Sequence, residues 1–325
     1  MRHSRLQLLA TIADLYYVEQ QNQSEIARKT GYSRSAISRL LTEARNLGVV
    51  EIRINHPLQR LSTLEYELID RFGLQACFVA QRGLLNYPRM QRLLGRLGAA
   101  YLSDNMQPDS RLSAGWGMGV YEVAQAFRER YWPNFQIIQM MGATGSVNAT
   151  IDGPGVVTQI ANTFSGTCRT LNAPLYVESQ ETRAALLRER NIRATLDLAS
   201  NANFALTGIA SIEPERSGIV RAGHLDVDEH KRTLDAGAIG DICGQLFDEN
   251  GRILDIDINH RVIGVDLTML QQNGCTIVGV AGGRIKAPAI RGALRGRLIN
   301  VLVTDSSAAE IILGKEATTV SSTLN

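Results

Sequence analysis

Residues 275–313 read CTIVGVAGGRIKAPAIRGALRGRLINVLVTDSSAAEIIL, and this stretch decides the fold class. The apolar runs 275–283 and 298–305 predict buried strands, and 286–296 and 306–313 predict helices. Two continuously apolar strands joined by a helix indicate a βαβ unit, whose strands are parallel and covered on both faces. The C-terminal part of the chain is therefore predicted to be an α/β domain.

The same alternation extends back towards the N-terminus from this unit. We expect strands at 77–81, 111–117, 136–141 and 203–210, and helices at 88–106, 119–130, 154–165 and 226–235. Residues 241–248 and 261–267 are predicted to be antiparallel strands around the turn 248–252. Residues 74–325 are thus predicted to form one Rossmann-like α/β domain with a mostly parallel sheet.

Composition excludes several classes of protein. The 325 residues are 44% hydrophobic and 20% charged, which is typical of a folded globular chain rather than a disordered one. There is no run of roughly 20 apolar residues that could span a membrane, and no secretory signal pattern follows Arg2 and Arg5. The four cysteines lie far apart, so we expect free thiols, a cytoplasmic protein, and neither a metal nor a cofactor.

The N-terminal 56 residues are a second domain with a different charge. They hold eight basic and five acidic residues, whereas the rest of the chain has a net charge of −1. Apolar periodicity predicts helices at 5–20, 23–30 and 34–47, and Ala27, Gly31 and Ile37 fit the spacing of a helix-turn-helix. A strand at 49–54 would make it winged, and 57–73 is predicted to be a linking helix that also contributes to dimerisation.

The third predicted helix of this N-terminal domain, 34–47, carries most of the residues expected to bind DNA. In a helix-turn-helix the N-terminal residues of that helix face the base edges in the major groove. We predict base contacts from Ser33, Arg34, Ser35, Ser38 and Arg39, and phosphate contacts from Arg28 and Arg45. Two alternatives remain open, because the charges could merely solvate a small helical bundle and helix-turn-helix units also dock proteins.

Three glycine-rich turns lie between a predicted strand and a predicted helix. They are Gly115–Gly117, 142–146 and 282–286, and each could present backbone N–H groups to an anion at the carboxyl edge of a parallel sheet. Lys286 adds a cation to the last turn, as a phosphate group requires. The alternative is that these glycines serve close packing or a positive φ.

Two long segments resemble the SorC family of bacterial sugar-responsive transcriptional regulators. They are LYYVEQQNQSEIARKTGYSRSAISRLLTEARNLGVVEIRI near the N-terminus, and GAIGDICGQLFDENGRILDIDINHRVIGVDL with the following VGVAGGRIKAPAIRGALRGRLINVLVTDSSAAEIIL near the C-terminus. The resemblance implies a sugar or sugar-phosphate effector, palindromic operators, dimers or tetramers, and an effector domain similar in fold to sugar-phosphate isomerases.

The resemblance also implies roles for individual residues. It makes Lys286, with Gly282 and Gly283, a phosphate site and Asp241 an acceptor for effector hydroxyls, although Asp241 could instead cap a strand edge. The remaining effector residues that it implies are Gly115, Trp116, Gly117, Gly142, Ala143, Thr144 and Arg169. Ala143 stands where a second glycine is usual, Met118-Gly119 replaces an Arg-Thr pair, and Arg169 could equally form a surface ion pair.

Two functions follow from the sequence. The first is a transcriptional regulator of a carbohydrate catabolic operon, with no catalytic residues, whose operator affinity depends on a sugar, polyol or sugar-phosphate. The second is an isomerase- or deaminase-type enzyme with an appended DNA-binding head, which needs a carboxylate or histidine base. A head with a net charge of only +3 is a weak anchor for DNA, so we expect a homodimer or homotetramer.

Overall fold

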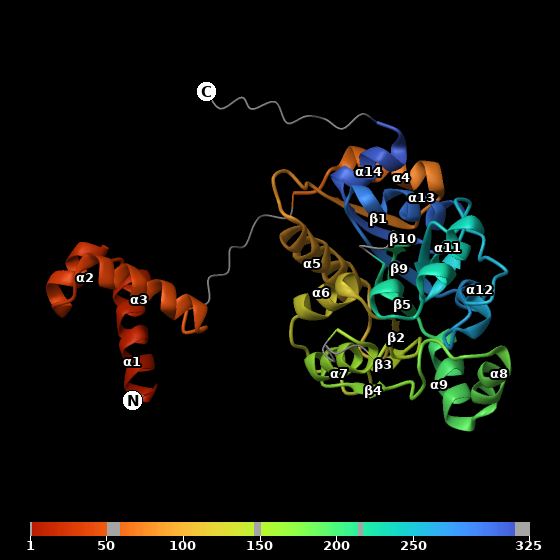
Figure 1. Ribbon diagram of the computed structural model, residues 1–325, viewed down its shortest axis with the longest axis horizontal. Coiled ribbons are helices and arrows are strands. Elements are labelled where there is room, and N and C mark those ends of the chain that lie inside the picture. The colour runs from red at the N-terminus through yellow and green to blue at the C-terminus, as the bar shows by residue number, and fades with distance from the viewer. Residues whose placement is uncertain (1, 51–58, 146–150, 214–216, 316–325) are drawn as a thin grey trace. The chain divides into compact units, whose positions relative to one another are not determined.

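The computed structural model describes residues 2–50, 59–145, 151–213 and 217–315. The chain divides into two compact units, Met1–Pro57 and Leu58–Asn325 (Figure 1). Each unit has its own hydrophobic core and is described by itself.

The smaller unit is a bundle of three helices. They are α1 (Arg2–Ala13), which continues as a π-helix over Asp14–Val18, α2 (Gln23–Thr30) and α3 (Arg34–Asn46). Asn22 caps α2 in a capping box with Glu25, Gly31 ends that helix with a φ of 76°, and the Ser33 hydroxyl caps α3 at the Ala36 N–H. The core consists of the apolar residues that recur at helical spacing, Leu9, Ile12, Leu15, Ile26, Ile37, Leu40, Leu41 and Ala44. The predicted helix-turn-helix arrangement is confirmed.

The predicted wing strand at 49–54 is only partly within the described residues. Val49 and Val50 form a bend rather than a strand, because both of their N–H groups donate to the carbonyl of Ala44 at 2.8 and 3.1 Å. The remainder of that prediction, residues 51–54, lies outside the described residues.

The larger unit is built on a sheet of seven strands, all parallel, in the order β1-β10-β9-β5-β2-β3-β4. The strands are β1 (Ala76–Ala80), β2 (Arg111–Ala114), β3 (Gln136–Gln139), β4 (Thr167–Arg169), β5 (Phe204–Gly208), β9 (Thr276–Val280) and β10 (Val301–Asp305). The predicted mostly parallel α/β fold is confirmed.

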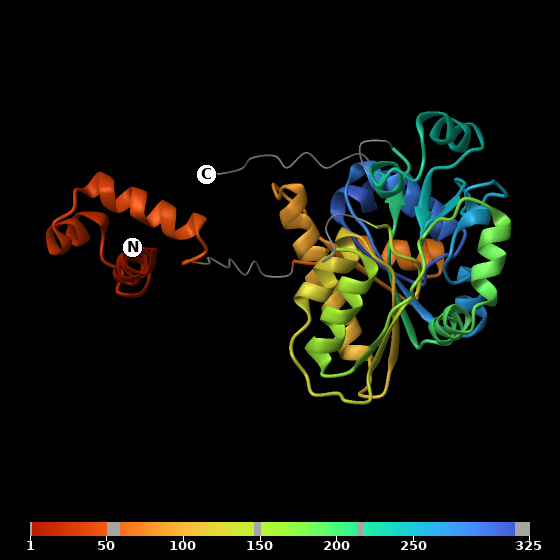
Figure 2. The same cartoon turned by 60° about the horizontal axis from the view of Figure 1, so that its bottom comes forward.

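Helices cover both faces of this sheet (Figures 1 and 2). One face carries α5 (Tyr87–Asn105), α6 (Met118–Ala126) and α7 (Gly153–Phe164). The other carries α4 (Ser62–Phe72), α8 (Gln180–Arg188), α9 (Arg190–Ser200), α12 (Leu267–Gln272), α13 (Ala287–Arg295) and α14 (Ser306–Leu313). Along the strands, Ile277 and Leu302 join one core whereas Val278 and Val303 join the other, which explains why the strands are apolar without alternation.

A small antiparallel sheet, β6 (Ala210–Ser211), β7 (Gly240–Ile242) and β8 (Gln245–Phe247), corrects one prediction. The expected strand 241–248 is divided by a turn at Cys243 and Gly244, which have φ values of 53° and 78°. The expected partner 261–267 does not pair with it as a strand, because Ile263 and Val265 donate to the carbonyls of Leu175 and Met140. The helices α10 (Gly218–Arg221) and α11 (Val227–Asp235) lie between β6 and β7 in the chain.

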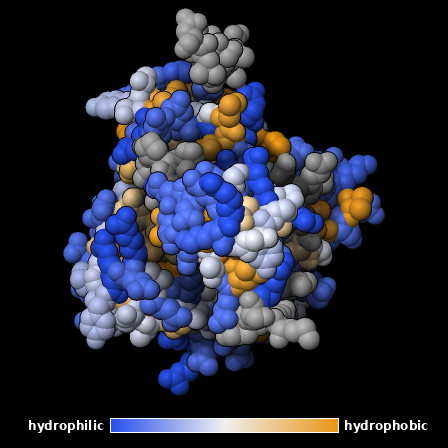
Figure 3. All heavy atoms as spheres, turned by 90° about the vertical axis from the view of Figure 1, so that its left-hand side faces the viewer, coloured by the Kyte–Doolittle hydropathy of each residue, from blue (hydrophilic) through white to orange (hydrophobic). Residues whose placement is uncertain are grey.

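The face of the molecule in Figure 3 is mostly hydrophilic, with hydrophobic residues in small, scattered groups. In the part of the chain that the structure describes, no helix is both long and apolar enough to cross a membrane.

Candidate functional site

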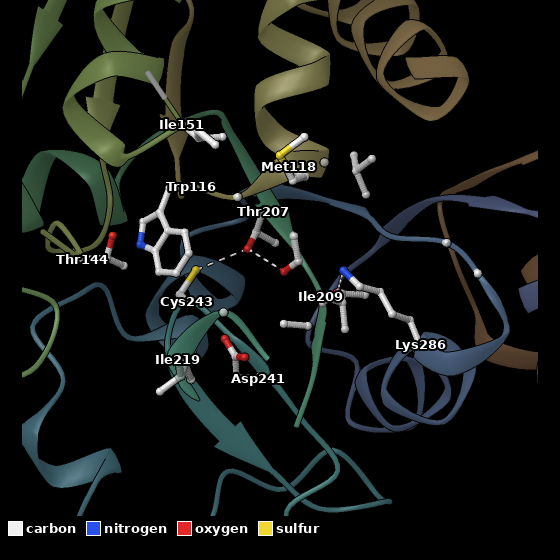
Figure 4. A pocket seen from close by; sticks show the side chains of 18 of the residues that line it. Trp116, Met118, Thr144, Ile151, Thr207, Ile209, Ile219, Asp241, Cys243 and Lys286 are labelled. Carbon is white, nitrogen blue, oxygen red and sulfur yellow. Dashed lines mark hydrogen bonds between the residues drawn. The ribbon is translucent and has the colours of Figure 1, made fainter. Parts of the chain in front are cut away.

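A cavity of about 770 Å³ lies in the larger unit at the carboxyl ends of β2, β3, β5 and β9. This is where parallel sheets bind ligands, and the volume suits a small molecule. Figure 4 shows its principal side chains, Trp116, Met118, Thr144, Ile151, Thr207, Ile209, Ile219, Asp241, Cys243 and Lys286.

The structure brings seven of the eleven predicted effector residues to this cavity. They are Trp116, Gly117, Thr144, Asp241, Gly282, Gly283 and Lys286. The other four, Gly115, Gly142, Ala143 and Arg169, are not part of its lining. Arg169 lies on β4, where its Nε donates to the Thr195 hydroxyl at 2.9 Å, and the described part of the chain gives it no ion pair.

Asp241 is a buried carboxylate on β7 that lines the cavity. Its Oδ2 accepts a 3.3 Å hydrogen bond from the Gly244 N–H, whereas its buried Oδ1 has no partner among the described residues. Burial raises the pKa of Asp241 to about 6, against the opposing effects of the Gly244 N–H and of Lys286. An unpartnered buried oxygen is costly, so a ligand hydroxyl that donates to Oδ1 would bind favourably.

Lys286 reaches the cavity from the short 3₁₀-helix Arg284–Lys286 that precedes α13. Its Nζ donates to the Ile209 carbonyl at 2.9 Å, which turns the ammonium towards the same region as Asp241 (Figure 4). Burial lowers the pKa of Lys286 to about 8, and Asp241 opposes that effect. An anionic ligand would relieve the cost of burying this cation.

The turn at 282–286 holds its shape through a buried carboxylate. The Gly283 N–H donates to Asp305 Oδ2 at 2.6 Å, so this group is already used inside the protein. A Cβ on Gly282 would lie 2.6 Å from the same oxygen, and Gly283 has a φ of 95°, so both positions require glycine. The turn therefore presents side chains to the cavity more than it presents glycine N–H groups.

The turn at 142–145 differs from the anion-binding nest that its sequence suggests. The N–H groups of Gly142, Ala143 and Thr144 donate to the Ile263 carbonyl, the Ala173 carbonyl and Asp152 Oδ1 at 2.9–3.1 Å. A Cβ on Gly142 would lie 2.2 Å from the Pro174 carbonyl oxygen. This glycine serves close packing, and only Thr144 and Gly145 of the described part of the turn line the cavity.

Trp116 supplies an apolar wall with one polar atom. Its ring packs near Gly218, and its buried Nε1 has no hydrogen-bond partner among the described residues. Met118, Ile151 and Ile219 extend the apolar surface around it (Figure 4). An aromatic ring beside a carboxylate suits a molecule that has both C–H faces and hydroxyl groups.

Some cavity residues were not predicted from the sequence. Arg82, Thr207 and Arg284 line it, and Arg82 directly follows the predicted strand 77–81. A general rule could have found Arg82, because residues at the carboxyl ends of parallel strands share one edge of the sheet.

Of the groups that a catalytic site could use, the cavity lining offers the Asp241 carboxylate and the Lys286 ammonium. Burial raises the pKa of the Cys243 thiol to about 12, so it stays protonated, and none of the described histidines lines the cavity. In the described segments no group of three His, Cys, Asp or Glu side chains could hold a metal ion.

In the smaller unit, the predicted DNA-binding residues are exposed on two helices. Ser33 to Arg39 surround the start of α3, Arg28 lies in the last turn of α2, and Arg45 lies in the last turn of α3. Ser33 is engaged in capping and its hydroxyl lies 3.0 Å from that of Ser35, whereas Arg34 and Arg39 extend from the helix surface.

A helix-turn-helix unit followed by an α/β unit with a ligand-sized cavity is the arrangement of a ligand-responsive transcriptional regulator. Comparisons agree with this class. The family model described as "Putative sugar-binding domain" matches residues 56–314. The chain belongs to the SorC-like family of transcriptional regulators that carry this domain.

Individual relatives cover nearly the whole chain. The transcriptional regulator LsrR of Enterobacter sp. (strain 638) is 35% identical over 309 residues, 94% of this chain and 93% of that protein. The deoxyribonucleoside regulator of Bacillus subtilis (strain 168) is 29% identical over 313 residues, 96% of this chain and 99% of that protein. The crystal structure of the full-length sorbitol operon regulator SorC from Klebsiella pneumoniae matches with a TM-score of 0.72 and 26% identity, over 95% of this chain and 99% of that one.

Proposed function

We propose that this regulator controls a carbohydrate catabolic operon from the cytoplasm, and that a sugar, polyol or sugar-phosphate in the cavity sets its affinity for operator DNA. The observation that carries the proposal is Asp241 Oδ1, which has no hydrogen-bond partner among the described residues and lines the same cavity as the ring of Trp116 and the ammonium of Lys286. Together they offer an acceptor for hydroxyls, a surface for C–H groups and a cation for a phosphate.

The DNA-binding half of the proposal rests on α3. Arg34 and Arg39 are exposed near its N-terminus, where a recognition helix meets base edges, and arginine binds guanine through two hydrogen bonds. One head carries a net charge of only +3, which supports two or more heads on one operator and hence a homo-oligomer.

Two measurements on the full chain test this function. Thermal denaturation against a panel of sugars, polyols and their phosphates should reveal a stabilising ligand, since bound ligand stabilises by RT ln(1+[L]/Kd). Selection from a random DNA pool should yield a bound sequence whose affinity changes with that ligand. A matched variant, Asp241→Ala, should lose the thermal shift while Asp255→Ala, an exposed carboxylate outside the cavity, should keep it.

Two results would overturn the proposal. One is a ligand that binds in the cavity without changing DNA affinity, because an effector must bind two states unequally. The other is turnover of a sugar-phosphate by the pure protein, which would favour the isomerase- or deaminase-type enzyme instead.

A further inference from the structure

The chain segment that leads from the helix-turn-helix unit is paired with the first strand of the larger unit. The Leu61 N–H donates to the Val79 carbonyl and the Gln81 N–H donates to the Gln59 carbonyl, both at 2.9 Å. We call this antiparallel pairing, which is centred on the bridge between Arg60 and Ala80, the tether pairing. It covers the outer edge of β1, whose other edge pairs with β10.

A buried carboxylate fixes the tether pairing. Glu65, on α4, is only 5% exposed, and its Oε1 accepts hydrogen bonds from Arg60 Nε and from the Val79 N–H, each at 2.9 Å. Its Oε2 accepts from Arg60 Nη2 at 2.7 Å, and the Arg60 guanidinium lies 4.5 Å from the centre of the Phe78 ring. The Glu65 carboxylate thus binds both segments of the tether pairing. Its contact with the Arg60 guanidinium is bidentate, and charged hydrogen bonds of this geometry are strong.

Arg82 follows the tether pairing by one residue and lines the cavity. Its backbone N–H donates to the Ser306 hydroxyl at 3.3 Å, and its Nη1 donates to the Ser307 hydroxyl at 2.9 Å. A Cβ built on Gly283 would lie 3.9 Å from the same Nη1, so the guanidinium lies beside the glycine turn of the cavity.

Among the described residues, the side-chain hydrogen bond of Arg82 goes to a neutral hydroxyl. Ser307 in turn donates to Asp305 Oδ1, and Asp305 Oδ2 accepts from the Gly283 N–H, so guanidinium and turn are joined through one network. A guanidinium has five N–H donors and binds an anion more strongly than a hydroxyl. A phosphate or carboxylate in the cavity would therefore compete with Ser307 for Arg82.

We propose that Arg82 binds an anionic group of the cavity's ligand and transmits that binding, through the tether pairing, to the segment that leads to the DNA-binding unit. The proposal rests on the proposed function and names its route of regulation. The two states that it requires differ in whether Arg82 contacts Ser307 or the ligand. Arg82 directly follows Gln81, whose N–H donates to the Gln59 carbonyl. A movement of Arg82 on ligand binding would therefore act on a hydrogen bond of the tether pairing only one residue away.

The first test measures anion binding to the full chain by calorimetry. The probe is inorganic phosphate, with chloride at matched ionic strength as the blank. We expect Arg82→Gln to weaken phosphate binding by about tenfold, the typical loss for one charged hydrogen bond. Arg89→Gln removes an exposed arginine on α5 outside the cavity lining, and should leave the affinity unchanged.

The second test follows hydrogen exchange of the Leu61 and Gln81 amides in the full chain. Phosphate should change their exchange rates in the wild type and in Arg89→Gln, and should leave them unchanged in Arg82→Gln. Glu65→Gln should keep phosphate affinity within about twofold, since Glu65 does not line the cavity, but should abolish the phosphate-dependent change at Leu61. If Glu65→Gln does not fold, Arg60→Ala tests the same step from the partly exposed side of the pair.

Three outcomes would overturn the inference. They are undiminished phosphate affinity in Arg82→Gln, phosphate binding that leaves both amides unaffected, and the absence of phosphate binding to the wild type. The last would leave the proposed function intact, because a neutral polyhydroxyl ligand of Asp241 would still satisfy it.

Discussion

Two glycine-rich turns of the larger unit are alike in sequence but differ in structure. Both follow a buried strand of the parallel sheet, at 142–145 and 282–286. In the first, three successive N–H groups are bonded within the protein and Gly142 packs against Pro174. In the second, a buried carboxylate holds Gly283, and the residues that follow present charged side chains to the cavity. Glycine in such a turn does not by itself indicate an anion site, and the anion site that we propose depends on the charged side chains beside the second turn.

The largest expected effect is on stability, from a substitution in the first turn, 142–145. Gly142→Ala should lower the free energy of unfolding by about 3 kcal/mol, because its Cβ would overlap the Pro174 carbonyl and neither backbone can move cheaply. Urea denaturation measures the change. Gly208→Ala is the matched control, since its Cβ meets nothing within 4 Å, and it should stay within about 0.5 kcal/mol. Equal stability of the two variants would mean that the first turn is not a packing site.

In the second turn, 282–286, we expect phosphate binding to depend on Lys286. Lys286→Met should weaken phosphate binding by roughly thirtyfold, or about 2 kcal/mol, because it removes the cation but not the turn. The ligand-free protein should not lose stability, since burial already lowers the pKa of this ammonium to about 8. Calorimetric titration checks the affinity, and Lys231→Met on α11, an exposed position outside the cavity, is the control. Unchanged affinity in Lys286→Met would place the anion elsewhere.

The buried carboxylate of Asp241, which lines the same cavity, should make the free energy of unfolding depend on pH. Its folded pKa of about 6 lies above the unfolded value of about 3.9, so the folded state holds more protons between these values. The associated stability is complete below the unfolded pKa and is lost as pH rises through 6. From pH 5 to 7 the wild type should lose about 1 kcal/mol relative to Asp241→Asn. Urea denaturation of both at several pH values tests this, and parallel profiles would contradict it.

The smallest effect should come from Ala143, where the SorC pattern has a second glycine. Its N–H and carbonyl bond Ala173 and Leu175, and its φ is not positive, so the fold does not need glycine there. Ala143→Gly should cost roughly 0.5–1 kcal/mol of unfolding free energy through backbone entropy and leave ligand affinity unchanged. A gain in phosphate affinity would instead show that the first turn can bind an anion.

The sequence predicted the sheet well because its central strands are buried on both faces. Continuous apolar runs such as 275–283 and 298–305 are then the expected signal, and their helices followed from spacing. The segment 261–267 was mispredicted since alternation shows only that a segment is extended and half-buried. Its partners, Met140 and Leu175, lie far away in the chain. Helices α8 and α9 and strand β4 were missed in the looser middle region.

The sequence by itself determined the two-part organisation, the parallel α/β fold, the helix-turn-helix and the residue types of the candidate site, because these depend on periodicity, caps and charge within short stretches. Only the tertiary structure decided which of those residues meet. It placed Asp241 and Lys286 at one cavity, left Asp241 Oδ1 without a partner among the described residues, and used the N–H groups of Gly142 to Thr144 inside the protein. Hydrogen bonds and burial depend on neighbours distant in sequence, so no local pattern could state them.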